Sequence, residues 1–251
     1  MNDYSVSYSI PKLKTNDNLK SSIQHLVSYL ESNNTLSHAI SILSQRFGIK
    51  RRRLYDIINV LMSVGCCQKS CLDQIIWYGK NKIIETIEKL KEVRNVEDSS
   101  ISLGNMFPVN NCIGISNLTI SFITLFFALK TNHLDLRFIA QFFSRQTTRY
   151  KTTLCKLYQI CFILGAVGVT TRTSQVCEVV LNEPYYDTNL CNIDTVEEEN
   201  DPLSISKLLN RPIAGVGAAH IMIRRKEFND NFIESVSSTM SRVTEDAYLE
   251  D

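Results

Sequence analysis

The sequence predicts a mainly helical α+β fold in which one small unit occurs twice. Three observations lead to this prediction. First, two segments of the chain have similar sequences at a constant spacing. Second, each copy has the pattern of three amphipathic helices followed by two short β-strands. Third, a cluster of basic residues begins one of these helices. With 251 residues the chain is long enough for two small domains.

The repeat is visible as matching strings of residues. Leu54–Ile57 reads Leu-Tyr-Asp-Ile and recurs as Leu-Tyr-Gln-Ile at Leu157–Ile160, and Val64-Gly65 recurs as Val167-Gly168. Both pairs are offset by 103 residues. A repeat of this length indicates a duplicated domain rather than a solenoid unit.

The first copy is predicted to contain three helices and a hairpin. Thr35 is a candidate N-cap for the second helix, and Gly48 ends it. The expected segments are helices over 19–31, about 36–47 and about 50–64, and strands near 66–69 and 74–78. This order is typical of a winged helix-turn-helix, in which the third helix reads DNA and the hairpin is the wing.

The second copy repeats this order, with a longer connection over 144–151 before its third helix. Asp135 is expected in the first turn of the second helix. The expected segments are helices over 118–129, 134–143 and 152–167, and strands near 169–173 and 176–181. The predicted fold is therefore α+β, mainly α, with two tandem winged helix-turn-helix domains.

A basic cluster begins the third helix of the first copy. Five positive charges and no negative charge lie between Arg46 and Arg53. Helical spacing places Leu54 and Ile57 on one side and Arg52 and Asn59 on the other, so one face can be buried while the other meets a ligand. Arginine is well suited to bidentate contact with guanine in the major groove. A solvated charged face is the alternative interpretation.

The run from Arg52 to Leu61, Arg-Arg-Leu-Tyr-Asp-Ile-Ile-Asn-Val-Leu, resembles the signature helix of the E2-factor/DP (E-two-F and dimerisation partner) transcription factors. Ile75–Gly79 resembles the last strand of that family's winged helix. The resemblance covers about residues 20–80. It implies binding to GC-rich promoter elements of cell-cycle and replication genes. Two copies in one chain resemble the atypical class, which needs no separate dimerisation partner.

The resemblance also implies roles for single residues. Arg52 and Arg53 match the base-contacting arginines of the family, and the residues that flank or orient them are Tyr55, Asp56 and Asn59. Phosphate contacts add affinity without sequence information. The candidates for such contacts are Arg46, Lys50, Arg51 and Lys69.

The second copy departs from this pattern, because the constant offset places Cys155 at the position of Arg52 and Phe162 at that of Asn59. Weak or nonspecific contact, a structural role and full sequence readout all stay open, and burial of Phe162 against the first domain is a further expectation. The candidate DNA contacts here are Arg145, Arg149, Lys151, Lys156 and Tyr158.

The expected organisation has five parts: a flexible N-terminus (1–18), the first domain (19–80), a helical linker (81–114), the second, divergent domain (115–187) and an acidic, largely flexible tail (188–251). Residues 173–206 carry eight acids and no Lys or Arg. The linker helix over 81–97 has an apolar stripe too short for a coiled coil, which favours packing across the domain over pairing with a partner helix. Two interpretations of Arg224-Arg225-Lys226 stay open, a nuclear import signal and a solvated basic cluster.

Composition and motifs narrow the function. The sequence has no long apolar run, no secretory signal and no paired Cys-x-x-Cys spacing, so we expect no membrane span, no disulfide framework and no metal. Of the eight cysteines, Cys66 and Cys67 stand at the start of an expected strand and are expected to be small buried side chains. No Walker loop, metalloprotease helix or serine elbow is present, and Gly215-Val216-Gly217 lacks the context of a phosphate loop. We expect no enzyme, no cofactor and no small-molecule substrate.

Together these expectations describe a nuclear transcription regulator that binds double-stranded DNA sequence-specifically. Repression is favoured over activation. Two alternatives stay open. One is a protein-interaction scaffold that has lost DNA reading, and the other is a conventional family member that needs a second family chain.

Overall fold

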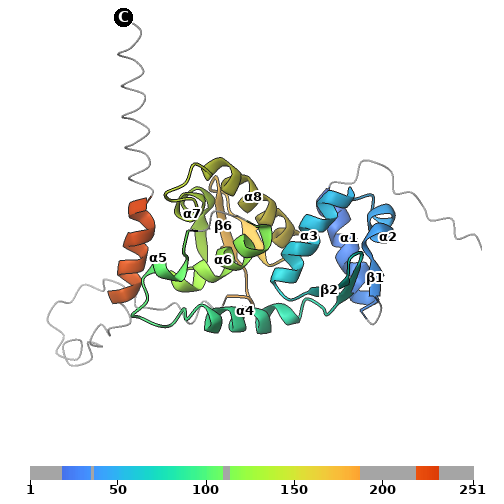
Figure 1. Ribbon diagram of the computed structural model, residues 1–251, viewed down its shortest axis with the longest axis horizontal. Coiled ribbons are helices and arrows are strands. Elements are labelled where there is room, and N and C mark those ends of the chain that lie inside the picture. The colour runs from blue at the N-terminus through green and yellow to red at the C-terminus, as the bar shows by residue number, and fades with distance from the viewer. Residues whose placement is uncertain (1–18, 35–36, 110–113, 187–218, 232–251) are drawn as a thin grey trace, which may run out of the picture.

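The computed structural model describes residues 19–34, 37–109, 114–186 and 219–231. They form two units, the segment that connects them and a further helix (Figure 1). The predicted N-terminal region 1–18, the cap at Thr35, the glycine motif at 215–217 and most of the predicted tail lie outside the described residues.

The first unit is a mixed α+β arrangement consistent with a winged helix. Its central strand is β3, which pairs antiparallel with β1 and β2 to give the order β1-β3-β2. Its elements are α1 (Leu19–Ser32), β1 (Ser37–Ala39), α2 (Ile40–Arg46), α3 (Arg51–Ser63), β2 (Cys67–Cys71) and β3 (Gln74–Trp77).

One predicted helix of this unit begins later than expected. Residues 37–39 form a strand rather than the first turn of the second helix, and Ser37 pairs with Ile76 across the sheet. The reason is tertiary, because β3 offers a free edge whose backbone groups need partners. A local helix signal cannot reveal that edge.

The second unit repeats the element order and the sheet order of the first. Its sheet is antiparallel with the order β4-β6-β5. Asp135 ends β4 and caps α7 by accepting a hydrogen bond from the backbone N–H of Arg137 at 2.7 Å, so it precedes the helix instead of lying in its first turn. The elements are α6 (Ile115–Ala128), β4 (His133–Asp135), α7 (Leu136–Phe143), α8 (Tyr150–Ala166), β5 (Thr170–Arg172) and β6 (Glu178–Leu181).

The spacing between the two units changes at one place. The start of α6 follows the start of α1 by 96 residues, and the start of β5 follows that of β2 by 103 residues. The second unit therefore carries seven extra residues: α7 is one residue longer than α2, the connection after it is two residues longer, and α8 is four residues longer than α3. The longer connection expected over 144–151 is thus partly helical, because α8 already begins at Tyr150.

The connecting segment contains α4 (Lys82–Val93) and the short helix α5 (Leu103–Met106). The apolar stripe expected in this helix consists of Ile83, Ile84, Ile87, Leu90 and Val93. Ile83 and Ile87 are buried and α4 packs against α6, while Ile84 and Val93 are exposed. Figure 1 shows α4 running along the side of the second unit towards the first. None of the helices in the described ranges is long and apolar enough to cross a membrane.

The described part of the predicted tail is a docked helix over 219–231, not a flexible segment. Arg224 is only 2% exposed and donates hydrogen bonds to the backbone oxygens of Val96, Asp98 and Ile101. Glu227 accepts hydrogen bonds from the first two backbone N–H groups of α5. Both interpretations of the basic triplet are therefore wrong for Arg224, which is inaccessible and unsolvated.

Two equivalent glycines allow a test of backbone strain. Gly65 and Gly168 have φ values of +81° and +85°, but a Cβ on Gly65 would lie 2.0 Å from Oγ1 of Thr86, whereas one on Gly168 would meet nothing within 4 Å. We expect Gly65→Ala to lower the free energy of unfolding by about 2–4 kcal/mol, from strain and clash together. Gly168→Ala should cost about 1–2 kcal/mol, from strain alone. Urea unfolding measures both, and equal losses would contradict the clash.

Candidate nucleic-acid interface

Helix α3 buries one face and exposes a basic one. Leu54, Ile57 and Ile58 are almost fully buried in the core of the first unit, as the helical spacing predicts. The first turn, Arg51–Arg53, is exposed. The core thus fixes the helix and leaves three guanidinium groups at its N-terminal end.

Arg52 and Arg53, the predicted base contacts, are available for a ligand. Neither makes a hydrogen bond or an ion pair with any residue that the structure describes. A guanidinium without a carboxylate partner can bind a duplex without first breaking an ion pair. The fork of each side chain suits the two acceptors on the edge of guanine.

Arg51 differs from its two neighbours because it is tied to the wing. Its guanidinium lies 2.9 Å from a carboxylate oxygen of Asp73, and Asp73 also accepts a 2.6 Å hydrogen bond from the hydroxyl of Ser41. The bond from Ser41, and then Arg51, lower the pKa of Asp73, while the hydrogen bond to Tyr55 and the charge of Asp73 raise the pKa of Arg51. The expected phosphate contact of Arg51 therefore competes with an existing ion pair.

Sequence reasoning missed Asp73. It lies in the turn between β2 and β3, and its backbone oxygen accepts a hydrogen bond from the N–H of Ile40 at the start of α2. One residue thus joins the wing to α2 and α3. A single acid in a polar turn carries no sequence signal for this role, since the bonds come from residues 22 to 33 positions away.

Tyr55 links the helix to the wing strand. The ammonium of Lys69 lies 5.3 Å from the centre of its ring and 3.4 Å from the side-chain oxygen of Asn59. Cations over aromatic rings are held by the ring quadrupole. The structure therefore brings together Tyr55, Asn59 and Lys69, three of the predicted site residues, on one face.

Two other predicted phosphate contacts lie beside this face. The guanidinium of Arg46 lies 4.1 Å from the centre of the Tyr29 ring, which holds it at the end of α2. Lys50, which immediately precedes α3, is exposed. Both side chains stay on the surface with their charges accessible.

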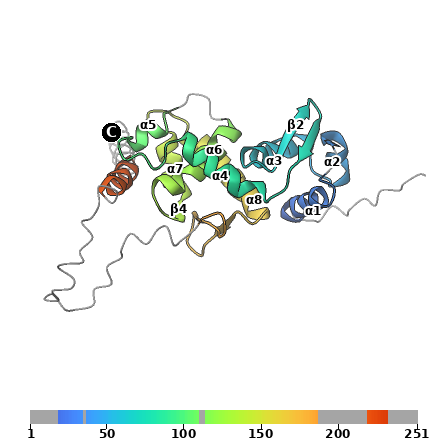
Figure 2. The ribbon, with the colours of Figure 1, turned by 90° about the horizontal axis from the view of Figure 1, so that it is seen from below.

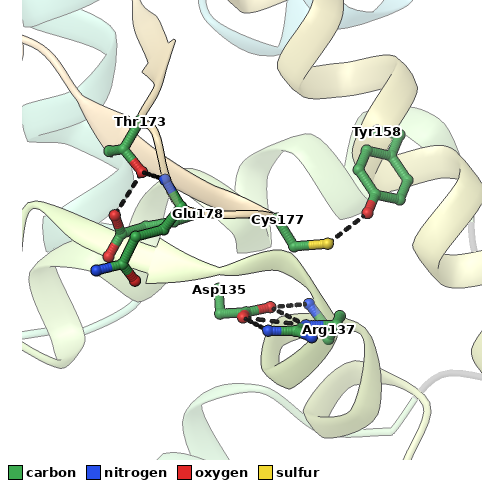
Figure 3. Close-up of polar contacts among 7 residues, drawn as sticks. Asp135, Arg137, Tyr158, Thr173, Cys177 and Glu178 are labelled. Atoms are coloured by element: carbon green, nitrogen blue, oxygen red, sulfur yellow. Dashed lines mark hydrogen bonds and ion pairs between the residues drawn. The ribbon is translucent and has the colours of Figure 1, made fainter.

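The second unit contains a counterpart of the tyrosine cluster. Arg172 of β5 lies 5.5 Å from the centre of the Tyr158 ring, as Lys69 does for Tyr55. Cys177 takes the place of Asp73 in the second unit, because its backbone oxygen accepts a hydrogen bond from the first N–H of α7, as that of Asp73 does from α2. The sulfur of Cys177 lies 2.8 Å from the hydroxyl of Tyr158 (Figure 3). That contact raises the pKa of Tyr158. Arg137 pairs here with Asp135, as Figure 3 also shows.

The predicted contacts of the second unit divide into two groups. Arg149 and Lys151 are exposed at the start of α8, and Lys156 and Tyr158 are partly exposed. Arg145 is different, because its guanidinium donates hydrogen bonds to the backbone oxygens of Phe142, Gly104 and Phe107. The prediction of a DNA contact for Arg145 is therefore replaced by a role in anchoring the connecting segment.

The two units meet through equivalent elements. Helix α3 contacts α6 and α8, and α1 contacts α8 (Figures 1 and 2). At the centre, the side-chain amide of Gln159 donates a 2.7 Å hydrogen bond to the carboxylate of Asp56, and these two residues stand at the same position in the two copies, 103 residues apart. A contact between equivalent positions is the mark of an isologous interface, so the units are related by an approximate two-fold axis. In the described residues Asp56 thus contacts the second unit, not the arginines that it was predicted to orient.

The Asp56–Gln159 bond gives a direct test of this interface. We expect Asp56→Ala and Gln159→Ala to be non-additive, with a coupling free energy of about 0.5–1.5 kcal/mol, because a partly buried hydrogen bond to a carboxylate is lost in either variant. Urea unfolding of the two single variants and the double variant measures it. Gln175, exposed in the second wing, is the matched control, and Gln175→Ala should be additive with Asp56→Ala.

Comparison with known proteins agrees with this geometry. Residues 15–79 match the model of the E2-factor/DP family winged-helix DNA-binding domain. The chain is similar to transcription factor E2F7 of Danio rerio, with 23% identity over 167 residues that cover 57% of this chain and 23% of that protein. It is also similar to the E2-factor-like transcription factor E2FE of Arabidopsis thaliana, with 39% identity over 49 residues, which are 20% of this chain and 12% of that protein.

The fold and the basic helix define a winged-helix DNA-binding domain. More particularly, residues 15–79 are similar to the winged-helix DNA-binding domain of the E2-factor/DP family, and the relatives named above are transcription factors. The chain spans less than a quarter of the length of these relatives. Within the described ranges, no group of three or more His, Cys, Asp or Glu side chains could hold a metal ion.

Proposed function

We propose that the chain is a nuclear transcription regulator that binds a GC-rich duplex as a single molecule, with two tandem winged helices in place of a dimer. The first is the winged helix of residues 19–80. The second is the divergent one of residues 115–187. The observation that carries this proposal is the contact between Asp56 and Gln159, equivalent residues of the two copies.

The contact has a consequence for DNA recognition. Because α3 and α8 lie next to an approximate two-fold axis, one chain presents two equivalent helices in the way that a symmetric dimer would. The covalent link also gives the second unit a high effective concentration. A separate dimerisation partner is then unnecessary.

The two units contribute unequally in this proposal. Arg52 and Arg53 read guanines in one half of the site. Cys155 and Lys156 occupy the equivalent positions in α8, so the second half is held by phosphate contacts from Arg149, Lys151 and Lys156. Relatives named E2F7 in Danio rerio and other vertebrates are transcription factors, which supports promoters as the location of the duplex.

The test is binding of the purified full chain to a duplex carrying a TTTCCCGC-type sequence and to a scrambled duplex of equal composition. We expect a preference for the first, a strong decrease in affinity with salt, and a native mass corresponding to one chain per duplex. Two chains per duplex would favour the conventional family member. No binding above background to either duplex at modest salt would favour the scaffold or a required partner chain.

A further inference from the structure

An open cavity of about 310 Å³ lies between the two units. Residues of α1, α3, α8 and β5 line it, so neither unit forms it alone. Its apolar floor includes Ile23 and Phe162, and Leu19, which is more exposed, lies at its mouth. Phe162 is thus partly buried at the junction of the units, as the sequence led us to expect. The volume lies at the lower end of the range of small-molecule sites, roughly 300–1,000 Å³.

Two guanidinium groups border this apolar floor. Arg53 of α3 and Arg172 of β5 both line the cavity and both are exposed. No Asp or Glu is among the lining residues, and the nearby carboxylate of Asp56 accepts the hydrogen bond of Gln159. The lining itself therefore carries two positive charges and no carboxylate, while Asp56 keeps its negative charge next to Gln159, outside the lining.

This combination selects for one chemical class of ligand. An inorganic phosphate would satisfy the guanidinium groups but leave the apolar floor in contact with water, and a neutral apolar molecule would do the reverse. A molecule with an apolar body and one carboxylate, sulfonate or phosphate group satisfies both. Tyr158 adds a phenol ring on the same wall.

We propose that the cavity is a regulatory site for an amphipathic organic anion, whose binding excludes DNA. The exclusion rests on the proposed function, because Arg53 is both a lining residue and the predicted contact to a guanine. Ligand bound to Arg53 would occupy the fork that the base requires. A small molecule bound in the cavity would thereby control DNA recognition by α3 without a separate regulatory domain.

Anilinonaphthalene sulfonate is a suitable probe, since it has an apolar body and one anionic group, and the neutral phenylnaphthylamine is its matched control. We expect the full chain without DNA to bind the sulfonate at one site, at least tenfold more tightly than the neutral compound. Arg53→Ala and Arg172→Ala should each weaken sulfonate binding by about tenfold or more, from the loss of a charge-assisted contact. Arg52→Ala, which does not line the cavity, should leave it unchanged.

A bulkier side chain provides a second test. Leu19 is partly exposed at the start of α1, so Leu19→Trp should fill the mouth of the cavity and weaken the probe without disturbing the core, with circular dichroism to confirm folding. Unchanged probe binding in Arg53→Ala, Arg172→Ala and Leu19→Trp would overturn the site, whatever the chain does with DNA. Probe binding that a saturating GC-rich duplex leaves intact would overturn the exclusion.

Discussion

The double substitution Arg52→Ala/Arg53→Ala should abolish the preference of the chain for a GC-rich site. Both side chains are exposed and lack polar partners among the described residues, so their removal leaves the core of the first unit intact. A bidentate contact to guanine contributes about 1–3 kcal/mol of discrimination, and two such contacts predict a loss of at least about 30-fold in the ratio of specific to nonspecific affinity. Competition between the two duplexes at fixed salt measures this ratio.

Lys50→Ala is the control for that experiment. The residue is exposed directly before α3, and its expected contact is a phosphate. Its loss should weaken binding to both duplexes alike and reduce the slope of log affinity against log salt by about one. A double arginine variant that keeps its preference, or one that loses both affinities equally, would refute base reading by α3.

The second large effect is expected in the core that holds this helix. Leu54 follows the basic cluster directly and is 0% exposed. Leu54→Ala should lower the free energy of unfolding by about 2–5 kcal/mol, since it removes buried methyl groups and leaves a cavity. Urea unfolding can be followed by the fluorescence of Trp77, the single tryptophan of the chain, which is buried in β3 of the same unit.

Leu72 offers the matched leucine for comparison. It lies in the turn of the first wing and is 92% exposed. Leu72→Ala should change the free energy of unfolding by less than about 0.5 kcal/mol. If the two substitutions cost the same, the burial of α3 against the core would be wrong.

The sequence indicated the helices of both copies because their apolar residues recur at helical spacing. The third helix of the first copy was expected over 50–64 and is observed over 51–63, and its basic end and buried face follow directly from that spacing. The strands β1 and β4 were missed, since three residues that pair with a distant strand carry no periodic signal. The docked helix over 219–231 was likewise unseen, because its bonds reach backbone oxygens more than 90 positions away.

The residues of the candidate site likewise divide into those that the sequence indicated and those that only the structure revealed. Sequence by itself determined which helix carries the arginines, that a second copy exists at a spacing of 103 residues, and that this copy lacks the paired arginines. Only the tertiary structure decided that Asp73 holds Arg51, that Arg145 turns inward, and that Asp56 meets Gln159 between the units. Periodicity reports the face that a helix buries within its own domain, whereas these contacts depend on how separate elements approach one another, and that approach is set by packing across the whole chain.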